Sequence, residues 1–151
     1  MSEQDHPLTD MPQLLLDGQL CFPLYAAARM VVNHYNPLLR PLGITYTQYI
    51  VLLALWESGS ATVGDLCRRL YLDNGTVTPL LKKMEEEGVL QRSRSKQDER
   101  VVTVTVTEKG WDLRRRVKDV PGQVGCCISL THDEAFQLYT LLRKMLGNME
   151  P

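Results

Sequence analysis

The most informative pattern of hydrophobic and polar positions lies between residues 70 and 107. Apolar side chains recur there at helical spacing and predict one buried helix face: Val77, Leu80, Leu81 and Met84. Three residues that can cap a helix start precede or open this stretch: Asp73, Asn74 and Thr76. Because Pro79 fits a helix comfortably only in the first turn, we expect the start nearer Thr76 than Asp73. Gly88, which tolerates the left-handed conformation, is expected to end the helix.

The positions after this helix alternate in a way that is typical of a β-hairpin. Residues 89–94 form one predicted strand, and residues 101–107, which are β-branched throughout, form the other. Five polar or charged residues, 95–99, join the two strands. Four basic side chains are concentrated on this ribbon: Arg92, Arg94, Lys96 and Arg100.

Apolar spacing predicts five more helices. The first begins in the apolar region after Leu14 and ends before Pro37, and the others cover 47–57, 62–70, 108–118 and 131–146. Thr62 and Thr107 are expected to cap the third and fourth of these helices, and Cys67 of the third is expected to pack in the interior. The helix at 47–57 is apolar nearly all round, so it is expected to be the central buried one. Between helices we expect a turn at 58–60, a loop or broken short helix at 36–43, and a break at 121–122.

The composition is that of an ordinary globular protein with no strong electrostatic bias. The 151 residues are 44% hydrophobic, and 17 Lys and Arg against 18 Asp and Glu give a net charge of −1. Residues 1–13 are expected to form a disordered tail. No apolar run reaches the length of about 20 residues that spans a membrane, and no signal peptide is evident, so we expect a cytoplasmic protein without a membrane partner.

The four cysteines and three histidines do not form a metal-binding pattern. There is no C-x-x-C pair and no evident zinc spacing, so neither a metal nor another cofactor is expected. No acid–base constellation suggests catalytic residues. Cytosolic thiols are kept reduced by default.

A short helix followed by a basic ribbon is the composition of a winged helix-turn-helix. The expected fold is therefore mainly α with a small β wing, and the apolar terminal helices are expected to form a homodimer interface. Small donors and then cations follow one another along the outer helix face, as suits contact with bases and phosphates: Asn74, Thr76, Thr78, Lys82 and Lys83. The alternative is a helix packed on a hairpin whose charged tip is simply solvated.

Cys21 has two interpretations. If Pro23 occupies the first position of a helix, Cys21 lies at the helix mouth, where free N–H groups and the helix dipole favour a thiolate. Alternatively, Cys21 is a small hydrophobic residue in a dimer core, which is the commoner situation for a free cysteine.

The chain from about Leu14 resembles the MarR family of winged-helix repressors. The resemblance rests on Leu-Tyr-Leu-Asp-Asn-Gly-Thr-Val-Thr-Pro-Leu-Leu-Lys-Lys-Met-Glu at 70–85 and Asp-Glu-Arg-Val-Val-Thr-Val-Thr-Val-Thr at 98–107. It implies a domain over 14–151, with a winged helix at about 47–107 and dimerisation helices at about 14–40 and 108–148. It also implies that Arg100 of the wing enters the minor groove, steadied by Asp98. The alternative is a surface salt bridge between the two that holds the hairpin tip, and the two roles are compatible.

Gln-Leu-Cys-Phe-Pro-Leu-Tyr at 19–25 is similar to the motif of the family's organic-hydroperoxide sensors. That resemblance implies that Cys21 is the peroxide-reactive thiol and that Tyr35 and Tyr46 hold it by hydrogen bonds. Ordinary amphipathic packing at a helix interface is the alternative role for the tyrosines. Pro23 departs from the motif, where a non-proline residue is expected.

Some members of that group carry a second, resolving cysteine after a Val-Pro-x-Gln-Val segment. Here Val-Pro-Gly-Gln-Val-Gly at 120–125 is followed by Cys126, at the matching spacing, and by an additional Cys127, so either can resolve. The resemblance thus implies a repressor that binds pseudo-palindromic double-stranded DNA as a reduced homodimer. Organic hydroperoxides would release it by forming an intersubunit disulfide. The alternatives are a repressor that senses a small ligand non-covalently and, from another class, a thiol peroxidase.

Overall fold

Helix α2 (Tyr46–Ser58) lies at the centre of the computed structural model, which describes residues 11–148 except 97 and 99. It was predicted as the buried central helix, and seven of its side chains are buried: Gln48, Tyr49, Val51, Leu52, Ala54, Leu55 and Trp56. Thr45 and Gln48 close a capping box at its N-terminus, each side chain bonding the other's backbone N–H. Of the predicted tail at 1–13, residues 1–10 lie outside the described residues.

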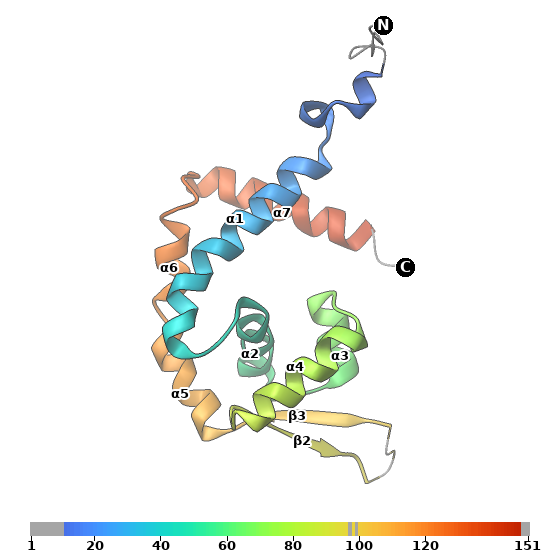
Figure 1. The fold of residues 1–151 in the computed structure, drawn as a ribbon, viewed down its shortest axis with the longest axis vertical. Coiled ribbons are helices and arrows are strands. Elements are labelled where there is room, and N and C mark those ends of the chain that lie inside the picture. The colour runs from blue at the N-terminus through green and yellow to red at the C-terminus, as the bar shows by residue number, and fades with distance from the viewer. Residues whose placement is uncertain (1–10, 97, 99, 149–151) are drawn as a thin grey trace, which may run out of the picture.

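The fold is a winged helix-turn-helix joined to helical arms, as predicted (Figure 1). Around α2 the lobe contains these elements in chain order: β1 (Ser60–Thr62), α3 (Val63–Leu70), α4 (Asn74–Glu86), β2 (Leu90–Arg94), β3 (Val102–Val106) and α5 (Glu108–Val117). The arms are α1 (Cys21–Leu39), α6 (Val120–Gly125) and α7 (His132–Asn148). Short 3₁₀ turns at Pro12–Leu14 and Leu16–Gly18 precede α1, and a third at Arg40–Leu42 follows it.

The sheet has three antiparallel strands in the order β1-β3-β2. The hairpin was predicted to within one residue at each end, and Arg92 pairs with Val104 at its middle. Strand β1 was not predicted, because the sequence indicated only a turn at 58–60. Gly59 does make that turn with φ +74°, and the next three residues pair with β3. Three residues carry too little pattern to announce a strand, so pairing with β3 creates it.

Two prolines lie further inside helices than the sequence predicted. Helix α4 begins at Asn74 with Asp73 as its N-cap, so the expectation of a start near Thr76 was wrong and Pro79 lies inside. Helix α1 was expected to end before Pro37 but continues to Leu39, which is fully buried. Each proline forgoes one intrahelical hydrogen bond, and burial of neighbouring side chains offsets that loss.

The predicted break at 121–122 is instead the start of a helix. Helix α6 begins at Val120, and Pro121 occupies its first turn, where a backbone N–H would have no intrahelical partner. Val120 and Val124 of this helix are buried, which joins α6 to the core. The predicted caps Thr62 and Thr107 are confirmed, since each hydroxyl accepts the backbone N–H three residues on.

In the part of the chain that is described, no single helix is long and apolar enough to span a membrane. The segments Cys21–Leu42 and Tyr46–Ser58 reach that length and apolar composition only when taken together, and a bend of 79° separates them.

Two of the side-chain hydrogen bonds that join α2 to the rest of the lobe reach α4 and α5. The indole Nε1 of Trp56 donates to the carbonyl oxygen of Gly110 in α5 at 3.1 Å. The amide of Gln48, which is buried, donates to Glu87 at the end of α4 at 3.2 Å. Because these bonds lie in or beside the core, they set how α4 and α5 sit against α2.

At Gly110 the backbone of α5 lies so close to the hairpin that no side chain fits between them, and this leads to a stability prediction. A Cβ there would collide with the carbonyl oxygen of Val89 and lie 2.6 Å from Cγ1 of Val106. Gly110→Ala should therefore lower the free energy of unfolding by about 1–3 kcal/mol, although alanine normally favours a helix. Urea unfolding at fixed protein concentration measures this.

Gly122→Ala is the matched control, because its added Cβ meets nothing within 4 Å in this chain. This variant should be unchanged or more stable by up to about 1 kcal/mol. Equal stability of Gly110→Ala and the parent would contradict the close packing of α5 on the hairpin.

Candidate nucleic-acid interface and thiol site

The outer face of α4 carries five exposed residues that the sequence assigned to DNA: Asn74, Thr76, Thr78, Lys82 and Lys83. Asp73 caps the helix by accepting the Thr76 backbone N–H at 2.8 Å, and this hydrogen bond lowers the pKa of the Asp73 carboxyl. The Thr76 hydroxyl also donates to Asp73, at 3.0 Å. Toward a base edge, Thr76 therefore offers its oxygen as an acceptor and its methyl group.

Cys67 of α3 forms a hydrogen bond to the first residue of α4. Its Sγ donates to Oδ1 of Asn74 at 3.2 Å, so the Asn74 amide NH₂ is left as the outward-facing donor group. Burial raises the pKa of the Cys67 thiol, and the negative charge of Asp73 adds to the shift. Cys67 is partly buried and packs against the core, as the sequence predicted.

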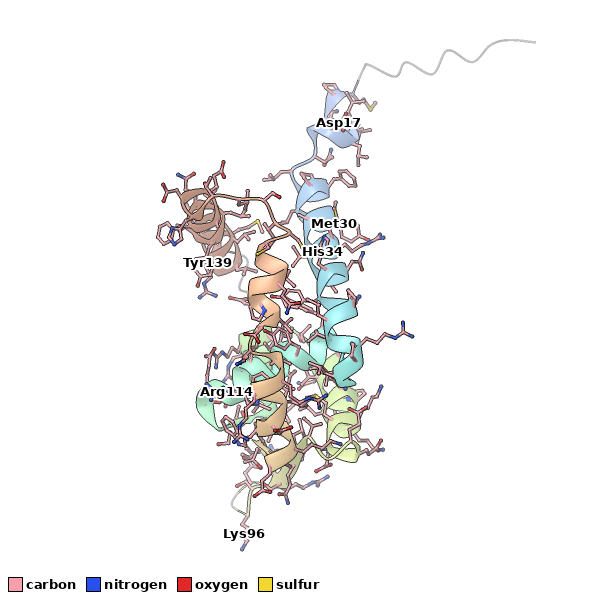
Figure 2. All side chains as sticks on the ribbon, turned by 90° about the vertical axis from the view of Figure 1, so that its left-hand side faces the viewer. Asp17, Met30, His34, Lys96, Arg114 and Tyr139 are labelled. Carbon is pink, nitrogen blue, oxygen red and sulfur yellow. The ribbon has the colours of Figure 1, made fainter. Side chains whose placement is uncertain are left out.

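The wing presents Arg94, Lys96 and Arg100 as exposed cations, and Figure 2 shows Lys96 at its tip. Asp98 accepts the backbone N–H of Arg100 at 3.0 Å, and its own carbonyl accepts that of Val101, also at 3.0 Å. Asp98 thus orders the backbone that carries Arg100, rather than only balancing its charge.

The wing and the helix face are brought together across one cleft. The cleft has a volume of about 410 Å³, and residues from both sides line it, among them Asn74, Thr78 and Arg100. Arg92, which was placed on the basic ribbon but not among the site residues, also lines this cleft.

Tyr35 and Tyr46 lie against each other with ring centroids 4.9 Å apart. A third ring, Tyr49, lies 5.6 Å from Tyr35 and 6.2 Å from Tyr46. Burial raises the pKa of all three phenols, and that of Tyr49 to about 12, so all three remain donors near neutral pH. Sequence reasoning missed Tyr49, although its spacing of three residues from Tyr46 places both on one helix face.

Cys21 is the first residue of α1 and is exposed. Tyr35 lies 14 residues further along the same helix, a separation of about 21 Å at 1.5 Å per residue. One chain therefore does not bring its own Cys21 to its own Tyr35.

Cys126 and Cys127 lie at the C-terminal end of α6, and both are exposed. The Cys127 thiol donates to the carbonyl oxygen of Gln123 at 3.6 Å. All four cysteines are free thiols in this structure. Within residues 11–148, apart from 97 and 99, no group of three or more His, Cys, Asp or Glu is placed to hold a metal ion.

The arms leave much apolar surface uncovered within one chain. None of the described residues of α7 is buried, and Phe136, Tyr139 and Leu141 are each more than 60% exposed. Figure 2 shows the side chains around Tyr139 projecting from α7. Between α1 and α7 lies a groove of about 850 Å³, lined mostly by apolar side chains such as Leu24, Val31 and Leu142.

Comparison with known proteins identifies close relatives of this chain. The profile of the transcriptional regulator SarA/Rot family matches residues 33–117. The "Organic hydroperoxide resistance transcriptional regulator" of Bacillus subtilis is 44% identical over 134 residues, which cover 89% of this chain and 91% of that protein.

Solved structures with the same fold include DNA complexes. AbfR of Staphylococcus epidermidis, in its reduced form bound to DNA, is 34% identical with a TM-score of 0.76, covering 92% of this chain and 97% of its own. AbfR is also known in a disulfide form, with a TM-score of 0.66. An Escherichia coli MarR variant complexed with operator DNA is 26% identical with a TM-score of 0.74, covering 90% and 97%.

Proposed function

This chain belongs to the MarR/SarA family of winged-helix transcriptional regulators, and on that premise we propose that it is a redox-sensing repressor. As a reduced homodimer it binds pseudo-palindromic DNA, and oxidation of Cys21 by an organic hydroperoxide releases it. Two observations together carry the proposal. The Cys21 thiol is exposed at the start of an arm helix, and the partly buried pair Tyr35 and Tyr46 lies too far away to contact Cys21 of the same chain.

The family's DNA-bound members support the first part of the proposal. Such proteins are regulators that bind DNA and not enzymes. In this chain α4 presents donors and then cations along one exposed face, and the wing adds three more cations. Two such lobes in a dimer read half-sites about one helical turn apart, with α4 in the major groove and the wing in the flanking minor groove.

A homodimer is supported by the apolar surface of the arms. An isolated helix with its apolar side chains in water is not stable, and α7 has no buried residue within the chain. A second copy covers α1 and α7 if the arms interleave. The same arrangement brings Cys21 to the partner's tyrosine cluster.

The thiol chemistry follows from the groups present. Phenol O–H groups that donate hydrogen bonds stabilise a thiolate, and Tyr35 and Tyr46 are protonated and able to donate. The thiolate attacks the terminal oxygen of the hydroperoxide, and an S–O bond forms as the O–O bond breaks. The alkoxide leaves as an alcohol after it takes a proton from water, and the sulfur becomes a sulfenic acid. The apolar neighbours Leu20 and Phe22 favour an alkyl hydroperoxide over hydrogen peroxide.

A second thiol then completes the switch. Its sulfur attacks the sulfenic sulfur, an S–S bond forms, and water leaves. Cys126, or Cys127 beside it, supplies this thiol from the partner chain. Because a disulfide needs Cα atoms within about 7 Å, closing it moves the arms and turns the two lobes out of register with DNA.

The DNA assignment predicts the effects of substitutions in the wing and in α4. Arg100→Ala should weaken binding to a duplex selected by the reduced protein by about 1–3 kcal/mol, because a groove contact is lost. Thr76→Ala and Thr78→Ala should reduce discrimination against random DNA, while Lys82→Ala should weaken both kinds of binding similarly. Fluorescence anisotropy measures these affinities.

Arg116→Ala on α5 is the control, since it removes an exposed arginine that does not line the cleft between α4 and the wing. It should bind both duplexes as the parent does. Parent affinity in a folded Arg100→Ala protein would contradict the wing assignment.

The sensing assignment predicts that Cys21→Ser binds DNA but is not released by cumene hydroperoxide, because a serine hydroxyl is not oxidised as a thiolate is to a sulfenic acid. Cys67→Ser should respond as the parent does. Tyr35→Phe and Tyr46→Phe should slow the response without abolishing it, since each removes one hydrogen bond to sulfur. The time course of anisotropy after peroxide addition reports all four. Release of Cys21→Ser at the parent's rate would exclude covalent sensing at this position.

The resolving step predicts a covalent dimer on non-reducing electrophoresis after a stoichiometric dose of hydroperoxide. The dimer should form in the parent and in Cys127→Ser, and be absent in Cys21→Ser and Cys126→Ser. The reverse behaviour of the Cys126 and Cys127 variants would transfer the resolving role to Cys127. DNA release without a covalent dimer in any variant would make this a one-cysteine sensor.

A further inference from the structure

The cleft between α4 and the wing contains a cation that neither the sequence motifs nor the proposed function uses. Besides Asn74, Thr78 and Arg100, this cleft of about 410 Å³ is lined by Arg92 of β2. Two arginines therefore contribute to its lining, and none of the described residues that line it carries a carboxylate. Hydroxyl, amide and guanidinium donors gathered in this way suit a phosphate oxygen.

Glu85 of α4 holds Arg92 in one orientation. Its Oε1 accepts the Arg92 backbone N–H at 2.8 Å, and its Oε2 accepts Nε at 2.9 Å and lies 2.8 Å from Nη2. Both side-chain contacts use the Nε–Nη2 edge of the planar guanidinium, so the N–H groups of Nη1 point away from Glu85. The Arg92 side chain is only 26% exposed, so few other side-chain conformations are open to it.

We propose that this cleft holds the sugar–phosphate backbone of one DNA strand, and that Arg92 is a phosphate-contacting residue which Glu85 orients. The inference rests on the DNA-binding part of the proposed function and does not depend on the thiol part. With α4 in the major groove and the wing in the adjoining minor groove, the strand that separates these grooves passes between them. A guanidinium already held in one orientation beside that passage loses less side-chain entropy when it binds a phosphate.

The test separates the charge of Arg92 from its pairing with Glu85. Arg92→Gln and Glu85→Gln both break the pair, but only the first removes the cation. The measurement is the dependence of duplex affinity on salt concentration, because each phosphate contact contributes about −0.9 to the slope of log K against log[salt]. A selected duplex and a random duplex are both used.

We expect Arg92→Gln to reduce the magnitude of the slope by about one and to weaken both duplexes by similar factors. Glu85→Gln should keep the parent slope, because the cation remains. Arg92→Lys should also keep it, since a point charge still reaches a phosphate. Arg115→Gln is the control: Arg115 lies 3.9 Å from Asp112 on α5, away from the cleft, and its loss should change neither slope nor affinity.

The proposal would be overturned if Arg92→Gln and Glu85→Gln lost affinity equally and both kept the parent slope. Arg92 would then only hold β2 to α4 through its ion pair with Glu85. A parent that binds neither duplex would overturn it together with the proposed function. A parent that binds DNA but ignores hydroperoxide overturns only the thiol part, and the slopes then still decide the role of Arg92. Circular dichroism of each variant establishes that the fold is retained.

Discussion

The structure depends on one constraint, which is that α2 is apolar on nearly every side and has to be covered on every side. A helix of this kind is stable in water only when other elements surround it. Helices α3 and α5 and strands β1 and β3 of the lobe do so, together with α1 (Figure 1). Polar contacts at its two ends then set the orientation of its neighbours, through Gln48 to Glu87 and through Trp56 to Gly110.

Because α2 touches both candidate sites, it links them physically. Its first turns carry Tyr46 and Tyr49, which stack with Tyr35 of the arm helix. One residue before Tyr49, Gln48 donates a hydrogen bond to Glu87 at the end of α4, the helix proposed to contact DNA. Packed and hydrogen-bonded groups therefore connect the tyrosine cluster to the C-terminal end of that helix.

The arms obey the opposite constraint, since they are amphipathic but uncovered. The lobe buries its own core, whereas α7 and the first half of α1 bury almost nothing within the chain. Apolar area of this extent is stabilising only when a second surface meets it. The surface that completes the fold is thus also the one that would bring the thiols of two chains together, so the proposed dimer and the proposed redox sensing both depend on the same helices.

The sequence by itself determined the order and type of the main helices, their caps, the hairpin and the exposed face of α4, because these follow from local spacing and local hydrogen bonds. Thr62 and Thr107, for example, cap the helices that the pattern assigned to them. Only the tertiary structure decided the outcome where the local sequence disfavours the observed element and contacts with distant segments stabilise it. Burial of Leu39 and Leu81 keeps Pro37 and Pro79 inside helices, and β3 turns three featureless residues into β1. The contact of Tyr49 with Tyr35 and that of Glu85 with Arg92 were likewise invisible in the sequence, because no local pattern records which side chains meet after the chain has folded.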